Sequence, residues 1–389
     1  MIFLIIHNEY RDRGGEETVV EFQKQLLESY GHKVLLYKRN YHEYGDSLFG
    51  KIKSVFTSVY NSRSVKDITS IVNKEKPQVA IIHNVFSIIS PAVIPALKKQ
   101  GVEVWQVVHN YRMFCPIGIF YNTRKGKICE ECLGRNREWN CLKNHCTENI
   151  FNDFAFSLKF SLVRKKNYYD SVDKFLCLNK RQMDKLKSYG INEKKLYFLP
   201  NAIKEENEEA PIQYEKKKYI GFAGRLTKEK GFYDFIELAK LMPKYTFRVA
   251  GKVPEDLEKE KLPANIVFLG FLDKKAMIDF YKTNKVLLFL SHWYETFGLT
   301  ALESMIQHTP VITYSVSAAS EIIEDKKDGF VLQKTGDILS LQQKVKELFD
   351  NQELYSYMCK NAYEKASKEY TPKKYYERLM NINTNLKDK

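Results

Sequence analysis

Residues 219–251 read YIGFAGRLTKEKGFYDFIELAKLMPKYTFRVAG, and this stretch sets the fold class. Its two ends, Tyr219–Ala223 and Phe247–Ala250, are short apolar runs, which are typical of buried strands. A helical pattern that begins near Gly231 lies between them. Strands that alternate with helices in this way form parallel sheets covered on both faces. The stretch therefore predicts one unit of a doubly wound α/β domain.

The same alternation extends along the chain in both directions. The other predicted strands are Ile2–Ile6, Val79–His83, Val102–His109, Phe175–Leu178, Leu196–Leu199, Ile266–Leu269, Val286–Leu290, Val311–Tyr314 and Phe330–Leu332. The other predicted helices are Glu17–Tyr30, Ser90–Lys99, Arg181–Tyr189 and those that begin near Lys274, Gly298 and Asp337. We therefore predict two doubly wound domains, with ligands bound at the carboxyl ends of the strands in the cleft between the domains.

Composition marks the boundaries of these domains. The segment AIKEENEEAPIQYEKKK is polar and charged and lacks an apolar period, so it is predicted to be a linker. Beyond Asp337 the pattern is helical to the end of the chain and breaks near Thr371–Pro372, which leaves a last helix, Lys373–Ile382. The predicted segments are a first domain at 1–201, the linker at 202–218, a second domain at 219–370 and a terminal segment at 371–389.

Charge is distributed unevenly over the 389 residues, whose 44% hydrophobic content is enough for sizeable cores. The formal net charge is +14; residues 1–200 carry 32 basic and 20 acidic residues, whereas residues 201–389 carry 30 and 28. A basic half predicts an anionic partner: nucleic acid, anionic lipid or a phosphorylated substrate. A general preference for lysine would give the same excess.

The apolar runs also bear on location. The first run, in MIFLII, spans six residues without a preceding basic segment, which disfavours a signal peptide. No run approaches the roughly 20 apolar residues of a membrane-spanning helix. We therefore expect a cytoplasmic protein, either soluble or peripheral on the inner face of the cell membrane.

A loop in the second half has the residues of a phosphate site. Gly221–Gly231 follows a strand and precedes a helix, so its backbone N–H groups can face a phosphate. Arg225 and Lys230 could together neutralise a diphosphate. The alternative is that these basic residues are simply solvated.

A second loop adds two carboxylates. Ser291–Met305 reads SHWYETFGLTALESM, and a helix that starts near Gly298 places Glu295 beside free backbone N–H groups and Glu303 about one turn further on. Carboxylates beside an anion site suit the hydroxyl groups of sugar and ribose rings. The alternative is that one glutamate only favours the helix dipole and the other is surface charge.

The order of GFAGRLTKEKG, FRVAGK, IVFLGFL, SHWYETFGLTALESM, TPVITY and EIIEDKKDGFVL resembles the family 4 retaining glycosyltransferases of GT-B architecture. Arg13–Glu16, Val107–Asn110 and Leu199–Ile203 extend the resemblance over nearly the whole chain. It implies an acceptor-binding Rossmann-like domain, a nucleotide-sugar-binding one, and a final helix that crosses back to the first. The implied enzyme is a retaining hexosyltransferase that moves a sugar from a UDP- or GDP-sugar to an acceptor hydroxyl, for which we expect a lipid-linked saccharide in cell-envelope polysaccharide synthesis.

The resemblance also implies roles for residues at the matching positions. Arg225 and Lys230 match the pair that clamps the diphosphate, Glu295 the residue that contacts the donor sugar, and Glu303 the residue that holds the ribose hydroxyls. His109 matches a residue at the junction of sugar and acceptor. The implied catalytic set is His109, Glu295, Arg225 and Lys230. The implied donor-binding set is Gly15, Arg225, Lys230, Glu295, Phe297, Gly298, Leu299 and Glu303.

The implied mechanism is electrostatic. The acceptor attacks from the face that the diphosphate leaves, and the departing diphosphate helps to deprotonate the acceptor hydroxyl. Arg225, Lys230 and helix N-termini stabilise the leaving group, so no divalent cation is expected for catalysis. One departure concerns Ser315–Glu321, SVSAASE, where alanines stand at positions in which the family often has glycine. That departure leaves the donor base and sugar open.

Cysteines cluster in the first half. The segment CEECLGRNREWNCLKNHC contains Cys129, Cys132, Cys141 and Cys146, with His145 as an alternative ligand. Four thiolates would suit a structural zinc ion that pins an insertion at about 115–146, although the spacing is short for a zinc ribbon. Metal-free structural thiols are the alternative. Because the insertion follows His109 closely, we expect it to border the acceptor.

Two stretches interleave basic and aromatic residues: Phe49–Arg63 and Phe151–Tyr169. Such a pattern suits an anionic membrane surface, and a core-facing stripe with a solvated lysine face is the alternative, favoured for the first stretch. No nucleic-acid motif accompanies the basic charge, so we expect no nucleic-acid partner. A GT-B sugar-nucleotide epimerase, or a transferase that acts on a soluble sugar-phosphate, are the other functions considered.

Overall fold

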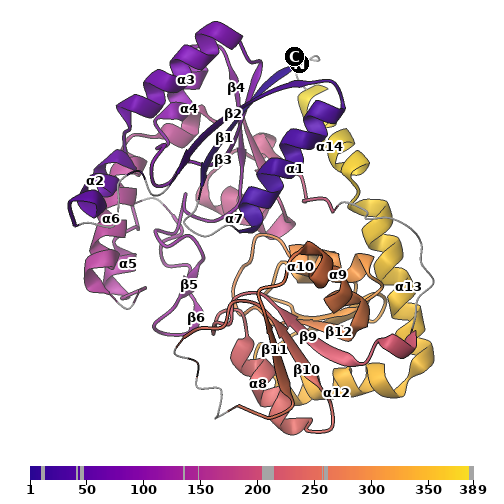
Figure 1. Cartoon of the computed structure of the whole chain (residues 1–389). Helices are drawn as coiled ribbons and strands as arrows, with labels where there is room; N and C mark the ends of the chain where they lie inside the picture. The colour runs from indigo at the N-terminus through magenta and orange to yellow at the C-terminus, as the bar shows by residue number, and fades with distance from the viewer. Residues whose placement is uncertain are drawn as a thin grey trace. The chain divides into compact units, whose positions relative to one another are not determined.

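A computed structural model describes residues 1–9, 14–40, 43, 48–134, 136–147, 149–203, 214–255, 257 and 262–384. The chain divides into two compact units (Figure 1). The first unit consists of Met1–Lys125, Cys129–Pro200 and Tyr376–Lys389, and the second of Gly126–Ile128 and Asn201–Tyr375. Each unit is built around one parallel sheet.

The sheet of the first unit has six strands in the order β2-β1-β3-β4-β7-β8. Their bounds are β1 Ile2–Glu9, β2 Lys33–Asn40, β3 Val79–Asn84, β4 Glu103–Val107, β7 Lys174–Cys177 and β8 Leu196–Phe198. Its helices are α1 Gly15–Ser29, α2 Leu48–Thr57, α3 Ser62–Glu75, α4 Val93–Lys99, α5 Asn140–Lys143, α6 Ile150–Lys165 and α7 Lys180–Tyr189, with 3-10 turns at Tyr168–Ser171 and Glu193–Lys195. A two-stranded sheet pairs β5 Tyr121–Asn122 with β6 Lys127–Ile128.

The sheet of the second unit has six strands in the order β11-β10-β9-β12-β13-β14. Their bounds are β9 Tyr219–Ala223, β10 Phe247–Ala250, β11 Ile266–Gly270, β12 Asn284–Phe289, β13 Val311–Tyr314 and β14 Gly329–Leu332. Its helices are α8 Phe232–Leu241, α9 Lys274–Thr283, α10 Leu299–Ile306, α11 Ala319–Ile322, α12 Ile338–Asp350 and α13 Gln352–Glu369, with a 3-10 turn at Tyr214–Lys216. The strands predicted at Tyr219–Ala223, Phe247–Ala250 and Val311–Tyr314 are confirmed to the residue.

The predicted fold class is confirmed: the chain is α/β with two parallel six-stranded sheets. In each sheet, the chain first adds strands on one side of its first strand and then adds the remaining strands on the other side. This is the order of doubly wound sheets. The order reverses between β1 and β3 in the first sheet and between β9 and β12 in the second. Ligands of such sheets bind at the carboxyl ends of the strands at this reversal.

Three local predictions need correction. Strand β2 was not predicted, because its sequence, KVLLYKRN, lies at the sheet edge, has charged residues at both ends and is only partly buried. The helical region beyond Asp337 is not continuous up to Thr371: Asn351 ends α12, and its side chain caps α13 by accepting the Leu354 N–H. Of the predicted linker, residues 204–213 lie outside the described residues, and its end is anchored, since Lys217 is buried and donates to Gln307 O at 3.0 Å.

The last helix, α14 Pro372–Thr384, contributes residues from Tyr376 onward to the first unit. The Tyr376 ring stacks on Tyr30 with centroids 3.6 Å apart, and its hydroxyl lies 2.8 Å from His32 Nε2. Lys174 Nζ donates to Ile382 O at 2.5 Å. The terminal helix is therefore attached to the first sheet although it follows the second in the chain.

Candidate active site

The reversal of strand order in the second unit lies between β9 and β12, so the loops that follow these strands meet at one edge of the sheet. The loop after β9 carries Arg225 and Lys230, and the loop after β12 carries Glu295. These two loops therefore bring together the basic and acidic residues that the sequence analysis selected separately.

Lys230 and Glu295 form the centre of this edge. Lys230 Nζ lies 2.6 Å from Glu295 Oε1, and the Glu295 side chain is 6% exposed. Ser291 Oγ donates a hydrogen bond to the same carboxylate oxygen. The Lys230 ammonium also lies over the Trp293 ring, 5.7 Å from its centroid. A buried carboxylate that contacts both a cation and a hydroxyl is held in a fixed position.

A second set of contacts fixes the loop that carries Glu295. His292 Nε2 lies 2.7 Å from Asp234 Oδ2, and the Tyr314 hydroxyl donates to the same oxygen at 2.7 Å. The backbone N–H of His292 donates to Glu229 O at 2.9 Å. Burial and the neighbouring Asp234 carboxylate raise the pKa of Tyr314, so this hydroxyl keeps its proton and remains a donor. The Asp234 carboxylate thus joins helix α8, strand β13 and the loop after β12, and the backbone bond to Glu229 O joins the loop after β9.

Arg225 does not join the central pair in this structure. Its side chain is 65% exposed, and its guanidinium lies 3.4 Å from Glu229 Oε1. A long exposed side chain reorients at little cost when a ligand charge arrives. The predicted diphosphate clamp therefore has one fixed cation, Lys230, and one that faces solvent.

Glycine at position 231 is required by the geometry of this loop. Gly231 has φ +75°, and a Cβ there would lie 2.0 Å from Leu290 O. Gly224 also has a positive φ, +141°, but nothing lies within 4 Å of its hypothetical Cβ. Gly221, interpreted from sequence as part of the phosphate approach, instead lies within β9, where a Cβ would meet Asn284 Nδ2 at 2.1 Å. Its role is packing.

Replacing Gly231 by alanine should therefore lower the free energy of unfolding by more than about 3 kcal/mol, because backbone strain and a backbone clash add. Gly336→Ala is the matched control in the same unit, with φ +74° and nothing within 4 Å of the added Cβ. The Gly336 variant should lose only the free energy of the backbone strain, so its free energy of unfolding should fall by about 1–2 kcal/mol. Urea unfolding followed by circular dichroism measures both. Equal losses in the two variants would refute the clash.

Helix α10 begins next to Glu295. Gly298 is its N-cap residue and Leu299 its first residue, while Phe297 is buried and lies 6.3 Å from the Tyr370 ring. A Cβ on Gly298 would lie 3.3 Å from the Cβ of Ala319, so the alanine-rich segment 315–321 packs against this glycine. The N-cap makes no side-chain hydrogen bond. The first-turn N–H groups of the helix are thus oriented as donors for an anion.

Glu303 lies one turn into α10 and does not contact the central pair. Its Oε2 accepts a hydrogen bond from the Tyr281 hydroxyl at 2.8 Å. Burial raises its pKa, an effect opposed by the Tyr281 hydrogen bond and by Lys274. The Tyr281 hydroxyl leaves Oε1 of Glu303 to receive a hydrogen bond from a ligand.

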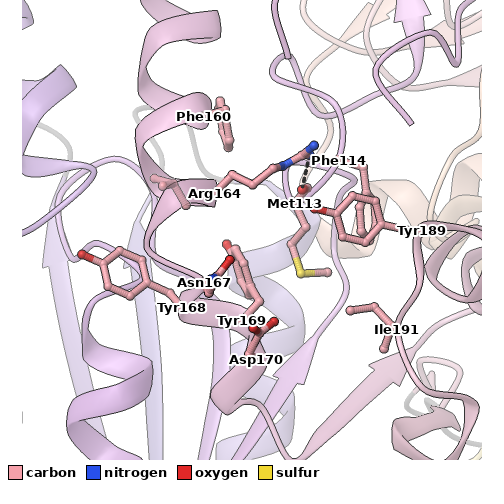
Figure 2. Close-up of a pocket in the computed structure, with 11 residues that line it drawn as sticks. Met113, Phe114, Phe160, Arg164, Asn167, Tyr168, Tyr169, Asp170, Tyr189 and Ile191 are labelled. Atoms are coloured by element: carbon pink, nitrogen blue, oxygen red, sulfur yellow. Dashed lines mark hydrogen bonds between the residues drawn. The ribbon is translucent and has the colours of Figure 1, made fainter. Parts of the chain in front are cut away.

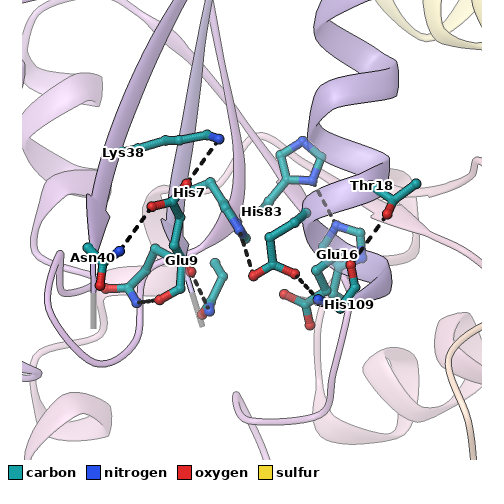
Figure 3. Close-up of polar contacts among 12 residues, drawn as sticks. His7, Glu9, Glu16, Thr18, Lys38, Asn40, His83 and His109 are labelled. Carbon is teal, nitrogen blue, oxygen red and sulfur yellow. Dashed lines mark hydrogen bonds and ion pairs between the residues drawn. The ribbon is translucent and has the colours of Figure 1, made fainter. Parts of the chain in front are cut away.

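His109 belongs to a histidine cluster at the carboxyl ends of three adjacent strands in the first unit (Figure 3). Nδ1 of His83 lies 2.7 Å from Nε2 of His109, and Nε2 of His83 lies 2.8 Å from Gln23 Oε1. Since the Gln23 oxygen accepts, His83 donates from Nε2 and accepts at Nδ1 from the N–H of His109. Nδ1 of His109 is then an acceptor. Buried His7, on β1, completes the cluster: its ring meets that of His83 edge-on with centroids 6.3 Å apart, and its Nε2 lies 3.6 Å from Glu17 Oε1.

Burial keeps the imidazoles of His83 and His109 neutral. It lowers the pKa of His109 to about 3, helped by the charge of His7 and opposed by Glu17. It also lowers the pKa of His83 well below its ordinary value, with His109 and His7 as further causes. His109 is therefore a neutral hydrogen-bonding group at physiological pH, with a tautomer set by its neighbours.

The loop after β1 is described only from Gly14 onward, so Arg13 of the predicted motif lies outside the described residues. Gly15 is the first residue of α1, and the Gly14 N–H donates to Glu17 Oε2 at 2.8 Å. Asn110 Nδ2 donates to Glu16 Oε1 at 3.5 Å, which connects this helix start to the loop of His109. The two amino-terminal motifs therefore form one cluster within the first unit.

Sequence reasoning missed four residues that hold the predicted ones: Ser291, Asp234, His83 and Gln23. His83 ends a predicted strand, and a polar residue at a strand's carboxyl end could have indicated it. Ser291 and Asp234 lie beside residues that were selected, but nothing in their spacing shows which side chains they contact. Gln23 reads as an ordinary helix residue.

A narrow pocket elsewhere in the first unit contains none of the predicted catalytic or donor-binding residues (Figure 2). Arg164 lies at its wall and donates to Gly134 O at 2.6 Å and to Met113 O at 3.3 Å. Its guanidinium also pairs with buried Glu138 and lies over Tyr189, 5.0 Å from the ring centroid. Arg164 is fully used in fastening the cysteine-bearing segment to α6, so the pocket is structural.

Residues 203–365 match the family model described as Glycosyl transferases group 1. This segment is a group 1 glycosyl transferase domain. It contains Arg225, Lys230, Glu295 and Glu303. The resemblance to glycosyltransferases found in the sequence is thus confirmed for this segment.

The chain is similar to several curated proteins. A 41.2 kDa protein in the cps region of Klebsiella pneumoniae is 28% identical over 198 residues, 48% of this chain and 52% of that protein. A 42.6 kDa protein in the same region is 25% identical over 85% of this chain and 84% of that protein. The poly(ribitol-phosphate) alpha-N-acetylglucosaminyltransferase of Staphylococcus aureus is 25% identical over 52% of this chain and 42% of that protein. The chain thus spans about half the length of the first and third relatives.

Solved structures share the fold. Sucrose-phosphate synthase from Thermosynechococcus elongatus gives a TM-score of 0.73 at 14% identity, over 99% of this chain and 98% of that chain. The lipopolysaccharide outer core galactosyltransferase WaaB gives a TM-score of 0.66 at 15% sequence identity, and the match covers 99% of each chain. Anabaena HepE in complex with UDP and glucose gives a TM-score of 0.66 at 13% sequence identity, and the match covers 99% of this chain and 100% of that chain. These likenesses establish the GT-B fold.

Proposed function

We propose that the chain is a retaining glycosyltransferase that moves a sugar from a nucleotide-diphosphate donor to an acceptor hydroxyl. The single observation that carries the proposal is the pair of Lys230 and Glu295, 2.6 Å apart at the reversal of strand order in the group 1 domain. A fixed cation beside helix N–H groups suits a diphosphate, and a fixed carboxylate suits sugar hydroxyls. UDP is the favoured nucleotide, because HepE binds UDP and glucose.

Each residue of the site has a task in this reaction. Lys230, Arg225 and the N-terminus of α10 at Leu299 stabilise the negative charge that develops on the leaving diphosphate. Glu295 accepts hydrogen bonds from the donor sugar, and Glu303 accepts them from the ribose. Because two side-chain cations and a helix terminus supply the countercharge, the proposed reaction needs no divalent cation.

The acceptor is proposed to bind the first unit, with neutral His109 as a hydrogen-bonding partner. The basic excess of residues 1–200 favours an anionic acceptor, and a saccharide linked to lipid through phosphate has this chemistry. Relatives in a cps region and the poly(ribitol-phosphate) transferase support a role in envelope polysaccharide synthesis. A soluble sugar-phosphate acceptor is the second candidate, since sucrose-phosphate synthase shares the fold.

Product analysis tests the proposed reaction. The chain is incubated with UDP-, GDP- and ADP-sugars, selected by the thermal stabilisation that each gives, and with saccharide acceptors, in the presence of EDTA. We expect nucleoside diphosphate release with transfer of the sugar, and NMR of the product should show the anomeric configuration of the donor. An isomerised donor without transfer would indicate an epimerase. An inverted product would contradict the retaining mechanism.

A peripheral position on the membrane is proposed from an apolar surface at the start of α6. Ile150, Phe151 and Phe154 on α6 are 52%, 81% and 49% exposed, and Trp139 lies against Phe154 with ring centroids 5.8 Å apart. We call these four residues the aromatic tip. None of the described helices is long and apolar enough to cross a membrane. Insertion of these side chains into the lipid interface is the contact that suits such a tip.

Further along the predicted basic stretch, Lys159 faces the protein, whereas Lys165 and Lys166 are exposed. Lys159 is buried, and its ammonium lies 5.5, 5.0 and 4.9 Å from the ring centroids of Phe86, Phe156 and Phe160. Burial and the nearby charge of Arg112 lower its pKa to about 7. The middle of α6 is therefore held by its own unit. The aromatic tip and exposed lysines, such as Lys143, Lys165 and Lys166, are available to anionic lipid.

Replacing Phe151 and Phe154 by serine should weaken binding to phosphatidylglycerol vesicles about tenfold or more, because two exposed rings no longer enter the lipid. Co-sedimentation at low salt measures the effect. Phe271→Ser is the control: this side chain is 86% exposed but belongs to the second unit. Equal weakening by the control, or no vesicle binding by the wild type, would remove the membrane proposal.

A further inference from the structure

Two sets of buried side chains have no task yet in the proposed reaction. The first is the predicted metal-ligand set: Cys129 is partly exposed, and the other three thiols pack with Ile117 in a small apolar cluster, namely Cys132, Cys141 and Cys146. Among the described residues, no group of three or more His, Cys, Asp or Glu side chains is arranged to hold a metal ion. In this structure the cysteines therefore contribute to packing. The second is Tyr281 of α9, which contacts the donor-binding set directly.

Tyr281 connects helix α9 to the proposed ribose carboxylate on helix α10. Its hydroxyl donates to Glu303 Oε2 at 2.8 Å, and its side chain is buried. The two helices pack against each other (Figure 1). Within the part of the chain that the structure describes, no other hydrogen bond or ion pair reaches the Glu303 carboxylate. One oxygen of Glu303 is therefore held by the protein, and the other is left for a ligand.

The backbone on both sides of this hydrogen bond is fastened to one residue, Thr309. Its Oγ1 donates to Tyr281 O at 2.7 Å. Ser304, the neighbour of Glu303 on α10, donates from Oγ to Thr309 O at 3.0 Å. Thr309 and Ser304 are both buried. The tyrosine and the glutamate are thus held in fixed positions relative to each other, so that the hydrogen bond between them selects one orientation of the Glu303 side chain.

The charges of the pair suit this task. Burial, and then the charge and hydrogen bond of Glu303, raise the pKa of Tyr281 well above its ordinary value, so the hydroxyl keeps its proton and remains a donor. Burial raises the pKa of Glu303, and the hydrogen bond from Tyr281 opposes that shift. An ionised carboxylate accepts stronger hydrogen bonds than a neutral acid. Tyr281 therefore favours the form of Glu303 that binds hydroxyl groups best.

We propose that Tyr281 is a positioning residue for the donor: by holding Oε2 of Glu303 it presents Oε1 to the ribose hydroxyls, and so sets a preference for a complete ribose over a deoxyribose. The inference rests on the proposed function, in which Glu303 accepts hydrogen bonds from the ribose. Tyr281 itself does not contact the nucleotide, because its single hydroxyl proton is committed to Glu303. A glutamate that is already oriented loses less conformational freedom when the ribose binds, which is worth about two- to tenfold in affinity.

A purely structural role for the hydroxyl predicts a different pattern. If the hydrogen bond only packs α9 on α10, its removal affects the stability of the unit and weakens every nucleotide alike. A hydrogen bond that acts through Glu303 instead changes the difference in affinity between a ribonucleotide and its deoxy analogue. Nucleotide selectivity therefore separates the two roles.

Isothermal titration of the wild type and Tyr281→Phe tests the proposal. Whichever of UDP and GDP the wild type binds is compared with its 2′-deoxy and 3′-deoxy forms. A hydrogen bond to a charged group is worth about tenfold or more, so the wild type should prefer the ribonucleotide by at least that factor over one or both deoxy forms. Tyr281→Phe should reduce this preference about three- to tenfold and leave the affinity for the less favoured deoxy form within about twofold.

Tyr355→Phe is the matched control, since it removes a hydroxyl from another buried tyrosine of the second unit, whose ring lies under the Lys285 ammonium at 3.6 Å. It should keep the preference of the wild type. In Glu303→Ala the preference should already be lost, and adding Tyr281→Phe should change it no further. A further change in the double variant would overturn the route through Glu303.

The outcomes also separate this inference from the proposed function. Equal weakening of the ribonucleotide and its deoxy forms in Tyr281→Phe, or an unchanged preference, would overturn the positioning role. A Tyr281→Phe protein that does not fold, as judged by circular dichroism, would show a structural role and overturn it as well. A wild type that binds the nucleotide without any preference for the ribose would overturn the inference but leave donor binding intact. Failure of the wild type to bind UDP or GDP would remove the proposed function, and this inference with it.

Discussion

Replacing Lys230 by alanine is expected to lower kcat/KM for sugar transfer by about 10²- to 10³-fold, the loss typical when one fixed group that stabilises developing charge is removed. Lys230 is the cation whose position is fixed within the second unit, because its ammonium is held 2.6 Å from Glu295 Oε1 and over the Trp293 ring. Arg225 is mostly exposed and must be ordered by the ligand. Loss of Lys230 therefore removes the pre-arranged part of the diphosphate clamp.

The matched control is Lys228→Ala, since this exposed lysine lies in the same loop and makes the same change in net charge. It should leave kcat/KM within about twofold of the wild type. Removing Lys230 also leaves the buried Glu295 carboxylate without its cation, so the free energy of unfolding is measured for each variant. Equal rates for the Lys230 variant and the wild type would refute the clamp. Equal losses of kcat/KM in both lysine variants would show that the effect of Lys230 is only a general effect of net charge.

Replacing His109 by asparagine is expected to lower kcat for transfer about 10²-fold or more while leaving the affinity for the donor within about twofold. His109 lies in the first unit, where we propose that the acceptor binds, and its hydrogen bond to His83 sets which ring nitrogen faces away from the cluster. Asparagine keeps a polar side chain but has no imidazole nitrogen in that position. His32→Asn, a variant of the same unit at the Tyr376 contact, should leave kcat unchanged. A loss of donor affinity equal to the loss of kcat would contradict a role on the acceptor side.

The pH dependence separates a neutral from a charged histidine. Because the pKa of His109 is about 3, its protonation cannot produce a break in the rate profile between about pH 5 and 8.

The same shift affects stability. His83 and His109 have lowered pKa values in the folded state, so their contribution is complete above the ordinary value of 6.5 and is lost as the pH falls from there toward 3. The wild type should therefore lose stability on acidification over this window by more than His109→Asn does.

Most of the fold follows from residue pattern. Near-continuous apolar strands separated by helices identify both sheets, and Tyr219–Ala223 is bounded correctly because a polar lysine precedes it and Gly224 follows it. The same pattern places the loops of Lys230 and Glu295 at strand ends. Pattern does not give strand order, and it is the adjacency of β9 and β12 that joins those two loops. The contact between Lys230 and Glu295 therefore depends on topology as well as sequence.

What could not be predicted depends on contacts between distant residues. Lys159 reads as part of a basic surface, but three phenylalanine rings enclose it. Cys115 lies 14 residues before the C-x-x-C pair, and it interacts electrostatically with Cys132 of that pair. The Gln23, His83 and His109 chain links residues from α1, β3 and the loop after β4. Spacing along the chain carries no signal for such contacts.

Binding of a nucleoside diphosphate tests most directly the claim that the second unit holds the donor through Lys230. Isothermal titration with UDP, and with GDP in parallel, is performed on the wild type, Lys230→Ala and Lys228→Ala. Loss of one charge-assisted contact is worth about 1.5–3 kcal/mol, so we predict that one of the nucleotides binds the wild type and Lys228→Ala equally and Lys230→Ala at least tenfold more weakly. Failure of both nucleotides to bind the wild type, or equal affinity in all three proteins, would contradict the account.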